Sequence, residues 1–406
     1  MRPGGAGSVD ADPHRVVAAL GIVQILAWGS SYYLLAILAA PISRDTGWPY
    51  AWVIGGVSVG LLVAGLVSVR VGRTIEAQGG RPVLAAAAML LALGLALLAS
   101  ARTLPVYFLS WSVIGAGMGA GLYDAAFATL GRLYGLAARR AITTLTLWGG
   151  FASTVCWPLS AWLVGELGWR GACLAYSGTH LVVTLPLVLV GIPAEPPAQR
   201  ASAAGQAPGV SMPTGRRLLV GLLAVILTAA AAIAAICSVH LIAMLEAGGL
   251  SLAAAVALGA LIGPAQVGAR VVELATGGRH HPIWTMAVAA VLIASGLALL
   301  SAGIRTTALA LIAYGAGNGL WSIARGALPL TLFGSAGYAA LVGRLALPSL
   351  LAQALAPTIG ALMIARLDAS ATIASLAILA LGNLAAVGLL WWLSAAWTPR
   401  MDAQGD

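Results

Sequence analysis

Charge is scarce in this sequence, and that scarcity narrows the class of protein. Only 8% of the 406 residues are charged, and lysine is absent, so all 21 basic residues are arginines. A soluble chain of this length needs far more charge to keep its surface in water. The formal net charge of +9 does not indicate a nucleic-acid binder either, because no basic stripe accompanies it.

Motifs that carry chemistry are also missing. The three cysteines, Cys156, Cys173 and Cys237, lie singly in apolar runs without a CxxC pair or a metal-ligand cluster. We expect them to be small buried hydrophobic residues. No P-loop is present, so neither ATP nor another cofactor is expected. The lack of clustered nucleophiles, paired acids and His-rich motifs argues against a membrane-embedded enzyme.

Apolar residues are abundant, with 60% hydrophobic residues and a mean hydropathy of +0.97. Apolar runs of about 20 residues recur, each long enough to cross a bilayer core, and a backbone in lipid must satisfy its own hydrogen bonds. We predict an all-α membrane protein of about twelve transmembrane helices. The expected helices cover 16–42, 52–71, 83–100, 105–130, 142–164, 172–192, 218–245, 252–275, 283–301, 307–333, 339–364 and 372–393.

A polar segment separates the first six predicted helices from the last six. It is rich in Pro, Ala, Ser and Gly and suits a flexible linker. The predicted organisation is an N-terminal six-helix bundle (1–192), a cytoplasmic linker (193–217) and a C-terminal six-helix bundle (218–406). Arginines in the segments assigned to the cytoplasm outnumber those in external loops by about three to one. We expect a bacterial inner (plasma) membrane, both termini in the cytoplasm, and no cleaved signal peptide.

The two halves of the chain repeat each other in three places. Segment 73–81 (RTIEAQGGR) matches 270–279 (RVVELATGGR), the glycines of 115–119 match those of 315–319, and Pro158 and Pro357 correspond. Three matches in one order are not easily chance. A six-helix unit repeated in parallel orientation predicts two pseudo-symmetric bundles with a substrate site between them near the midplane.

The loop after the second predicted helix carries Gly72, Glu76, Gly79 and Arg81. This pattern resembles the Gly-x-x-x-Asp-x-x-Gly-x-Arg signature of the major facilitator superfamily, with Glu in place of Asp. The sequence GWR at 168–170 is similar to a loop usual before helix 6 of that family. The resemblance implies a secondary transporter whose helices 1, 4, 7 and 10 line the cavity.

Within that superfamily the chain is most similar to monocarboxylate transporters and oxalate–formate antiporters. Segment 45–52 (DTGWPYAW) resembles the aromatic GWS motif that opens their helix 2. Their helix 8 typically carries an acidic or polar residue and, four positions later, an arginine that binds carboxylate. Gln266 and Arg270 occupy those positions, so the resemblance implies a carboxylate substrate.

Two of the helices expected to line the cavity carry polar and aromatic faces. Helical spacing places Gln24, Trp28, Ser31 and Tyr32 on one face of the first helix. Such a face suits a cavity for a small polar organic molecule, and hydrogen bonding between helices is the alternative. The expected substrate-binding residues are Gln24, Trp28, Tyr32, Tyr314, Asn318, Trp321, Arg325, Gln266 and Arg270.

Asp124 and Arg325 lie inside predicted helices, where a charge costs at least about 2.5–3.5 kcal/mol and marks a functional candidate. Their near-equivalent repeat positions lead to the hypothesis that they face each other, with Arg325 binding an anion and Asp124 titrating or gating. A structural pair that closes one side is the alternative. His240 could relay protons or only satisfy hydrogen bonds. The expected coupling or gating residues are Asp124, His240, Arg73, Glu76, Arg81, Glu273 and Arg279.

The sequence thus predicts a secondary active transporter of a small organic solute, first of all a carboxylate anion, moved with a proton or a counter-substrate. The alternative is proton-coupled efflux of drugs or other toxic compounds, metalloids included, which an aromatic cavity and intramembrane cysteines would fit. The expected partners are the small-molecule substrate and the lipid bilayer, without nucleic acid, and we expect a monomer.

Overall fold

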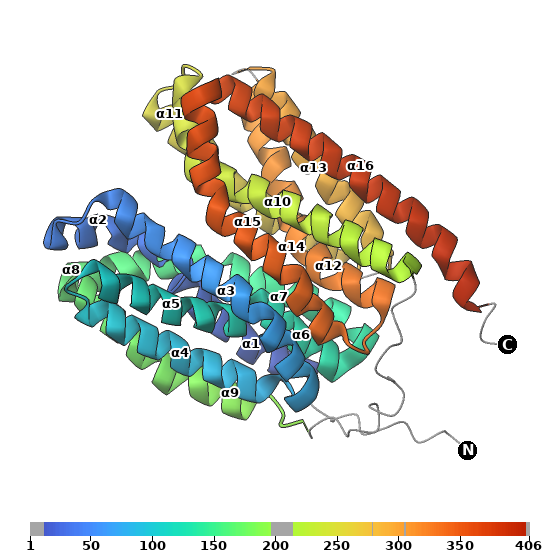
Figure 1. Cartoon of the computed structure of the whole chain (residues 1–406), viewed down its shortest axis with the longest axis horizontal. Helices are drawn as coiled ribbons and strands as arrows, with labels where there is room; N and C mark the ends of the chain where they lie inside the picture. The colour runs from blue at the N-terminus through green and yellow to red at the C-terminus, as the bar shows by residue number, and fades with distance from the viewer. Residues whose placement is uncertain (1–11, 196–213, 278, 304–305, 403–406) are drawn as a thin grey trace. The chain divides into compact units, whose positions relative to one another are not determined.

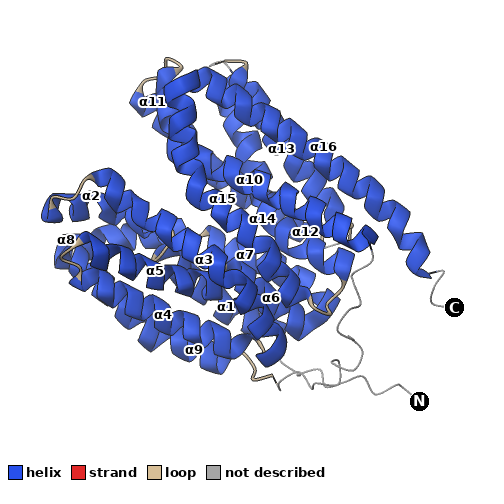
Figure 2. Cartoon of the chain, viewed as in Figure 1, coloured by secondary structure: helices blue, strands red, loops and turns tan. Residues whose placement is uncertain are grey.

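The computed structural model describes residues 12–195, 214–277, 279–303 and 306–402, and every regular element within them is helical (Figure 2). Nine stretches of these residues are long and apolar enough to cross a membrane. One of them, Leu104–Gly191, contains three of the predicted transmembrane helices. The less apolar Thr307–Phe333 is a further complete helix. The prediction of an all-α, multi-pass membrane protein is confirmed.

The helices follow the predicted order, from blue to red in Figure 1. In the first part of the chain they are α1 (Pro13–Gly29), α2 (Leu34–Thr46), α3 (Tyr50–Gln78), α4 (Gly80–Ser100), α5 (Leu104–Gly121), α6 (Tyr123–Tyr134), the short η1 (Gly135–Ala137), α7 (Ala138–Gly150), α8 (Ala152–Thr179), the π-helical turn η2 (His180–Thr184) and α9 (Leu185–Gly191). In the second part they are α10 (Thr214–Ala247), α11 (Leu252–Gly259), α12 (Ile262–Ala275), α13 (Pro282–Ser301), α14 (Thr307–Phe333), α15 (Tyr338–Leu367) and α16 (Ala369–Asp402). Most of the predicted linker lies outside the described residues, and the division into bundles at 193–217 stays a prediction.

Four of the predicted transmembrane helices are interrupted. The interruptions lie at residues 30–33 between α1 and α2, at Leu122 between α5 and α6, at Phe151 between α7 and α8, and at 260–261 between α11 and α12. The apolar runs continue through Leu122, Phe151 and 260–261, so hydropathy does not reveal those three interruptions, whereas residues 30–33 (SSYY) are polar. Irregular backbone at membrane depth is tolerated only where it is buried in protein or lines a cavity. The interruptions are therefore candidate positions for a functional site.

The chain divides into two compact units. Unit 1 comprises Met1–Ala198 and Phe333–Ala354, and unit 2 comprises Gln199–Leu332 and Leu355–Asp406. The first half of α15 therefore belongs to unit 1. In unit 1, α5 packs on α3 and α4, around a core that includes the fully buried Trp111, while in unit 2 α16 packs on α10 and α13.

The repeat seen in the sequence recurs in the packing inside each unit. The outer two glycines of the stripe 115–119 in α5 lie against the backbone of α3, and those of the stripe 315–319 in α14 lie against the backbone of α12. The middle glycines, Gly117 and Gly317, face α4 and α13 instead. Small residues let helix backbones approach closely in membranes. Helices α3, α4 and α5 therefore pack with one another as α12, α13 and α14 do.

Candidate functional site

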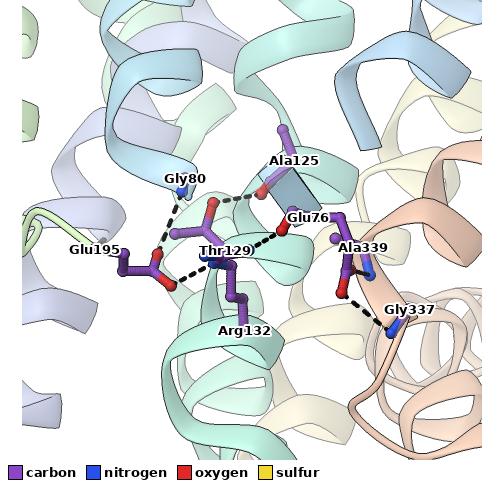
Figure 3. Close-up of polar contacts among 8 residues, drawn as sticks. All are labelled: Glu76, Gly80, Ala125, Thr129, Arg132, Glu195, Gly337 and Ala339. Atoms are coloured by element: carbon purple, nitrogen blue, oxygen red, sulfur yellow. Dashed lines mark hydrogen bonds and ion pairs between the residues drawn. The ribbon is translucent and has the colours of Figure 1, made fainter. Parts of the chain in front are cut away.

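A network of polar contacts joins the end of α3 to the start of α15, both within unit 1 (Figure 3). One carboxylate oxygen of Glu76 accepts the backbone N–H of Gly337 at 3.1 Å, and the other accepts that of Ala339 at 3.2 Å. The N-terminus of a helix carries unpaired N–H groups and favours an anion. Glu76, a predicted gating residue, therefore caps the first turn of α15.

Close packing accompanies this cap. A Cβ atom added to Gly72 of α3 would clash with the backbone carbonyl oxygen of Ala339 in α15, so only glycine fits there without a backbone shift. The Ser68 hydroxyl donates to the Gly343 carbonyl at 2.8 Å. The gap left between these helices measures about 10 Å³, and Asp124 of α6 is among its lining residues. Asp124, predicted to titrate or gate, thus lies beside the contact between α3 and α15.

The other part of the network in Figure 3 was not predicted from the sequence. Glu195, in the segment after α9, forms an ion pair with Arg132 of α6 at 2.6 Å, with only 8% of the Glu195 side chain exposed. The same carboxylate accepts the backbone N–H of Gly80 at 3.3 Å, and Arg132 Nη1 donates to the backbone carbonyl of Glu76. Glu195 belongs to the segment predicted to be a flexible linker, whereas the structure ties it to the α3–α4 turn.

Glu273, the repeat partner of Glu76, has contacts of its own within unit 2. It is 8% exposed, and one carboxylate oxygen accepts the Thr285 hydroxyl at 2.9 Å and lies 3.2 Å from His280 Nε2. The two equivalent acids therefore differ, since one caps a helix and the other is held by its neighbours in α13 and the loop before it. The remaining predicted gating residues are exposed (Arg73, Arg279) or half-buried (Arg81).

The residues predicted on helix 1 lie at the interruption between α1 and α2. Gln24 is fully buried, and its amide is engaged at both ends: Nε2 donates to the Gly121 carbonyl at 2.7 Å, and Oε1 accepts from Trp28 Nε1 at 3.0 Å. Gly121 is the last residue of α5, next to the interruption at Leu122. Gln24 therefore links two interrupted helices, while Trp28 and Tyr32 remain half-buried.

Five aromatic side chains, which we call the ring cluster, gather around this point. The Trp28 ring lies 5.4, 5.9 and 5.2 Å from those of Tyr32, Tyr33 and Tyr123, and the Tyr33 ring lies 6.1 Å from that of Trp157 in α8. The sequence analysis identified Trp28 and Tyr32 from their helical spacing. Tyr33 was not predicted because the residue after Tyr32 lies on another face of an unbroken helix. Tyr123 and Trp157 come from other helices.

Behind the same interruption lies a buried histidine that the predictions did not use. His180 Nε2 is 2.7 Å from the Ser30 hydroxyl, at the first residue of the interruption. His180 opens the π-helical turn η2 and is 1% exposed. Among the described residues, no hydrogen-bond partner is found for His180 Nδ1 or for the Thr184 hydroxyl. Two irregular backbone segments thus meet at one hydrogen bond.

In unit 2, the arginine that was predicted to bind a carboxylate lies against α14. Arg270 of α12 is 6% exposed, and its Nε donates to the carbonyl of Gly319 at 3.4 Å. A Cβ atom on Gly319 would lie 2.9 Å from the Gln266 Cα, so glycine lets α12 approach α14 this closely. The other predicted residues of α14 are buried (Tyr314, Trp321) or half-buried (Asn318, Arg325).

His240, predicted for proton coupling, lies in α10 of unit 2. Its Nε2 is 2.7 Å from the Pro357 carbonyl of α15. A carbonyl can only accept, so Nε2 carries the proton in this contact. A Cβ on Gly360 would lie 2.8 Å from the imidazole, so glycine makes room for the ring. The histidine is thus held by a hydrogen bond to the α15 backbone.

The sequence GWR at 168–170, which resembles a loop of the superfamily, contacts Asp45 at the end of α2. The Trp169 indole N–H donates to Asp45 Oδ2 at 3.0 Å, and Arg170 forms an ion pair with the same oxygen. Gly168 before them turns the chain inside α8 with φ 68° and ψ 173°. This contact joins two segments that were recognised separately in the sequence.

No protein-family model matches the chain. Over 221 residues it is 28% identical to mouse (Mus musculus) monocarboxylate transporter 11, which covers 50% of this chain and 47% of that protein. The chain therefore spans about half the length of this curated relative.

Solved structures match nearly the whole chain. The human organic anion transporter MFSD10 (TETRAN) superposes with a TM-score of 0.72 at 17% identity, covering 93% of this chain and 100% of that one. FucP, a major facilitator superfamily transporter in the outward conformation, gives 0.72 at 14% identity over 92% and 98% of the two chains. The proton:xylose symporter XylE gives 0.68 at 13% identity over 93% and 95%. The chain has the major facilitator fold, with twelve helices in two bundles.

Proposed function

We propose that this chain is a secondary active transporter that carries small organic carboxylate anions across the inner membrane by alternating access. The observation that carries the proposal is Arg270, a 6% exposed arginine inside a membrane helix. Similarity to a protein named a monocarboxylate transporter, over half of its length, supports the choice of substrate class, and the fold supports the choice of mechanism.

The cost of burying an arginine in a membrane helix argues for a functional role of Arg270. A charge in a transmembrane helix costs several kcal/mol, and such residues face a bundle interior or an aqueous cavity and mark substrate pathways. A guanidinium presents five N–H donors in a planar fork that matches a carboxylate, whereas an ammonium is a point charge. Arg325 of α14 is the second cation proposed for the anion, and Asn318 on the same helix face is the proposed neutral partner.

The contacts of the two repeat-related acids support alternating access. Glu76 caps the start of α15, whereas Glu273 is held by Thr285 and His280. Repeats that exchange roles during a cycle are expected to differ in any one state. In this proposal, release of the Glu76 cap opens the predicted cytoplasmic side, and Asp124 or His240 carries the coupled proton.

A binding screen tests the proposal. The purified full chain is heated with monocarboxylates, dicarboxylates or cationic drugs, because a ligand that binds the folded state raises its apparent stability. The same screen is run on Arg270→Gln and Arg325→Gln, with the exposed Arg366→Gln as the matched control. We expect stabilisation by a carboxylate that is lost in the first two variants and kept in the third.

Proton-coupled efflux of amphipathic drugs is the second candidate, and the ring cluster is the observation that favours it. If only cationic drugs stabilise the protein, and the two arginine variants respond as the wild type does, the carboxylate proposal is rejected. Drug efflux is then the better-supported function.

A further inference from the structure

We propose that the transported carboxylate carries an aromatic ring, and that the ring cluster of unit 1 selects for it. The inference rests on the proposed function, because it names the class of carboxylate. The five rings are Trp28, Tyr32, Tyr33, Tyr123 and Trp157.

Three helix interruptions converge on these rings. Tyr32 and Tyr33 lie within the interruption at 30–33, and Tyr123 directly follows the one at Leu122. The Tyr123 hydroxyl donates to the Thr146 carbonyl at 3.2 Å in α7, which ends at the third interruption. Interrupted membrane helices gather around the substrate sites of transporters. The rings therefore occupy the place where such a site is expected.

Four of the five rings are partly accessible in unit 1, whereas Tyr123 is only 8% exposed and belongs to its core. Trp28, Tyr32 and Tyr33 are half-buried, and Trp157 is 43% exposed. In the core of the same unit, Trp111 is 0% exposed. A ring added from outside can therefore reach the accessible parts of Trp28, Tyr32, Tyr33 and Trp157.

Two polar groups of the cluster form hydrogen bonds inside unit 1. The Trp28 indole N–H donates to the buried Gln24, and the Tyr123 hydroxyl donates to a backbone carbonyl. The ring pairs are edge-on or tilted at centroid distances of 5.2 to 6.1 Å, which is the range in which aromatic pairs attract. A solute that reaches the cluster therefore meets aromatic ring surface. A planar aromatic solute gains ring–ring attraction there, and an aliphatic solute gains only apolar contact.

Charge favours an aromatic acid over an aromatic amine. A protein carboxylate facing the rings would favour a cationic ligand, because it would attract an ammonium group that the ring faces also attract. Asp124, the acid closest in sequence to the cluster, instead lines the gap that it shares with Ser68, Gly72 and Gly343. The anionic group of the ligand follows from the proposed function.

The experiment measures dissociation constants on the wild-type full chain for three ligands: phenylacetate, cyclohexylacetate and 2-phenylethylamine. The two acids have the same charge and similar size and differ in aromaticity. We expect phenylacetate to bind about ten-fold more tightly than cyclohexylacetate, the factor that one good aromatic pair supplies. Equal binding of the two acids would overturn the inference and leave the proposed function intact. Binding of the amine alone would reject both.

Variants locate the preference. Tyr32→Leu should reduce the preference for phenylacetate to about two-fold or less, and Tyr32→Phe, which keeps the ring, should preserve it. Trp52→Leu is the control, because Trp52 is 54% exposed and pairs with Phe108 outside the cluster. A preference that survives Tyr32→Leu, or that is lost equally in Trp52→Leu, would show that the ring cluster does not select the substrate.

Discussion

Substituting Glu76→Gln should loosen the first half of α15 from α3. The carboxylate accepts two backbone N–H groups, from Gly337 and Ala339. Glutamine keeps one acceptor oxygen and loses the charge that the helix N-terminus favours. A hydrogen bond to a charged group contributes about 1.5–3 kcal/mol, and the helix dipole adds about 0.3–1 kcal/mol. The change should therefore cost the packed state about 2 kcal/mol, a shift of roughly 30-fold in population.

Cysteine labelling measures this shift. Ser68→Cys is nearly isosteric, and Ser68 is 3% exposed at the α3–α15 contact. The native Cys156, Cys173 and Cys237 are all buried and should give a low background. Where opening is fast compared with labelling, the rate follows the open population. Glu76→Gln should raise the maleimide labelling rate of Ser68→Cys by about 30-fold.

The matched control is Glu246→Gln, which removes an acid that is exposed and outside this contact. Glu76→Asp, which keeps the charge on a shorter side chain, should lie between the wild type and Glu76→Gln. An unchanged labelling rate in Glu76→Gln would refute the reasoning, since the cap would then contribute nothing to the packing of α15.

Three further substitutions test the packing and the polar contacts. Glu195→Gln breaks a largely buried ion pair and should lower the thermal midpoint by several degrees, for a loss of about 1.5–3 kcal/mol; a midpoint equal to wild type would mean that the segment after α9 is not tied down. Ser30→Ala removes the hydrogen bond to His180 and should destabilise by about 0.6–2 kcal/mol in the same assay; a stabilised variant would contradict this. Gly319→Ala overpacks the contact with α12 and should lower the free energy of unfolding by about 1–3 kcal/mol. Gly263→Ala is the control, because nothing lies within 4 Å of its added Cβ, and it should be neutral or slightly stabilising. Equal thermal midpoints for the two variants would argue against the close approach of α12 and α14.

The helices could be predicted from the sequence because the bilayer imposes a simple rule on them. A segment of about 20 apolar residues must be helical in lipid, and all twelve predicted ranges correspond to helical segments of the structure. The glycine stripes at 115–119 and 315–319 predicted the repeat, since close helix packing depends on small residues at fixed spacing.

The helix interruptions could not be predicted in the same way. The residues around Leu122 and Phe151 are as apolar inside the interruptions as outside, and hydropathy carries no information on backbone dihedral angles. Helical spacing found Trp28 and Tyr32, which are four positions apart, but not Tyr33, because in an unbroken helix the residue after Tyr32 lies on another face.

Contacts between distant segments were missed for a different reason. Glu195 lies 63 residues from Arg132, and nothing local in either segment indicates the other. Gln24 was predicted to face a solute because its position on the helix is right. Its partner, the Gly121 carbonyl, becomes available only because α5 ends there. The roles proposed for these residues in transport stay predictions.

Counterflow in proteoliposomes tests the central claim most directly. Vesicles containing the full chain are loaded with unlabelled phenylacetate or cyclohexylacetate, and uptake of the same labelled acid is followed without an ion gradient. The account predicts accelerated exchange in wild type, lost in Arg270→Gln, not restored in Arg270→Lys because an ammonium lacks the planar fork, and retained in Arg366→Gln. Exchange that persists in Arg270→Gln, or a wild type that binds carboxylates and never exchanges them, would contradict it.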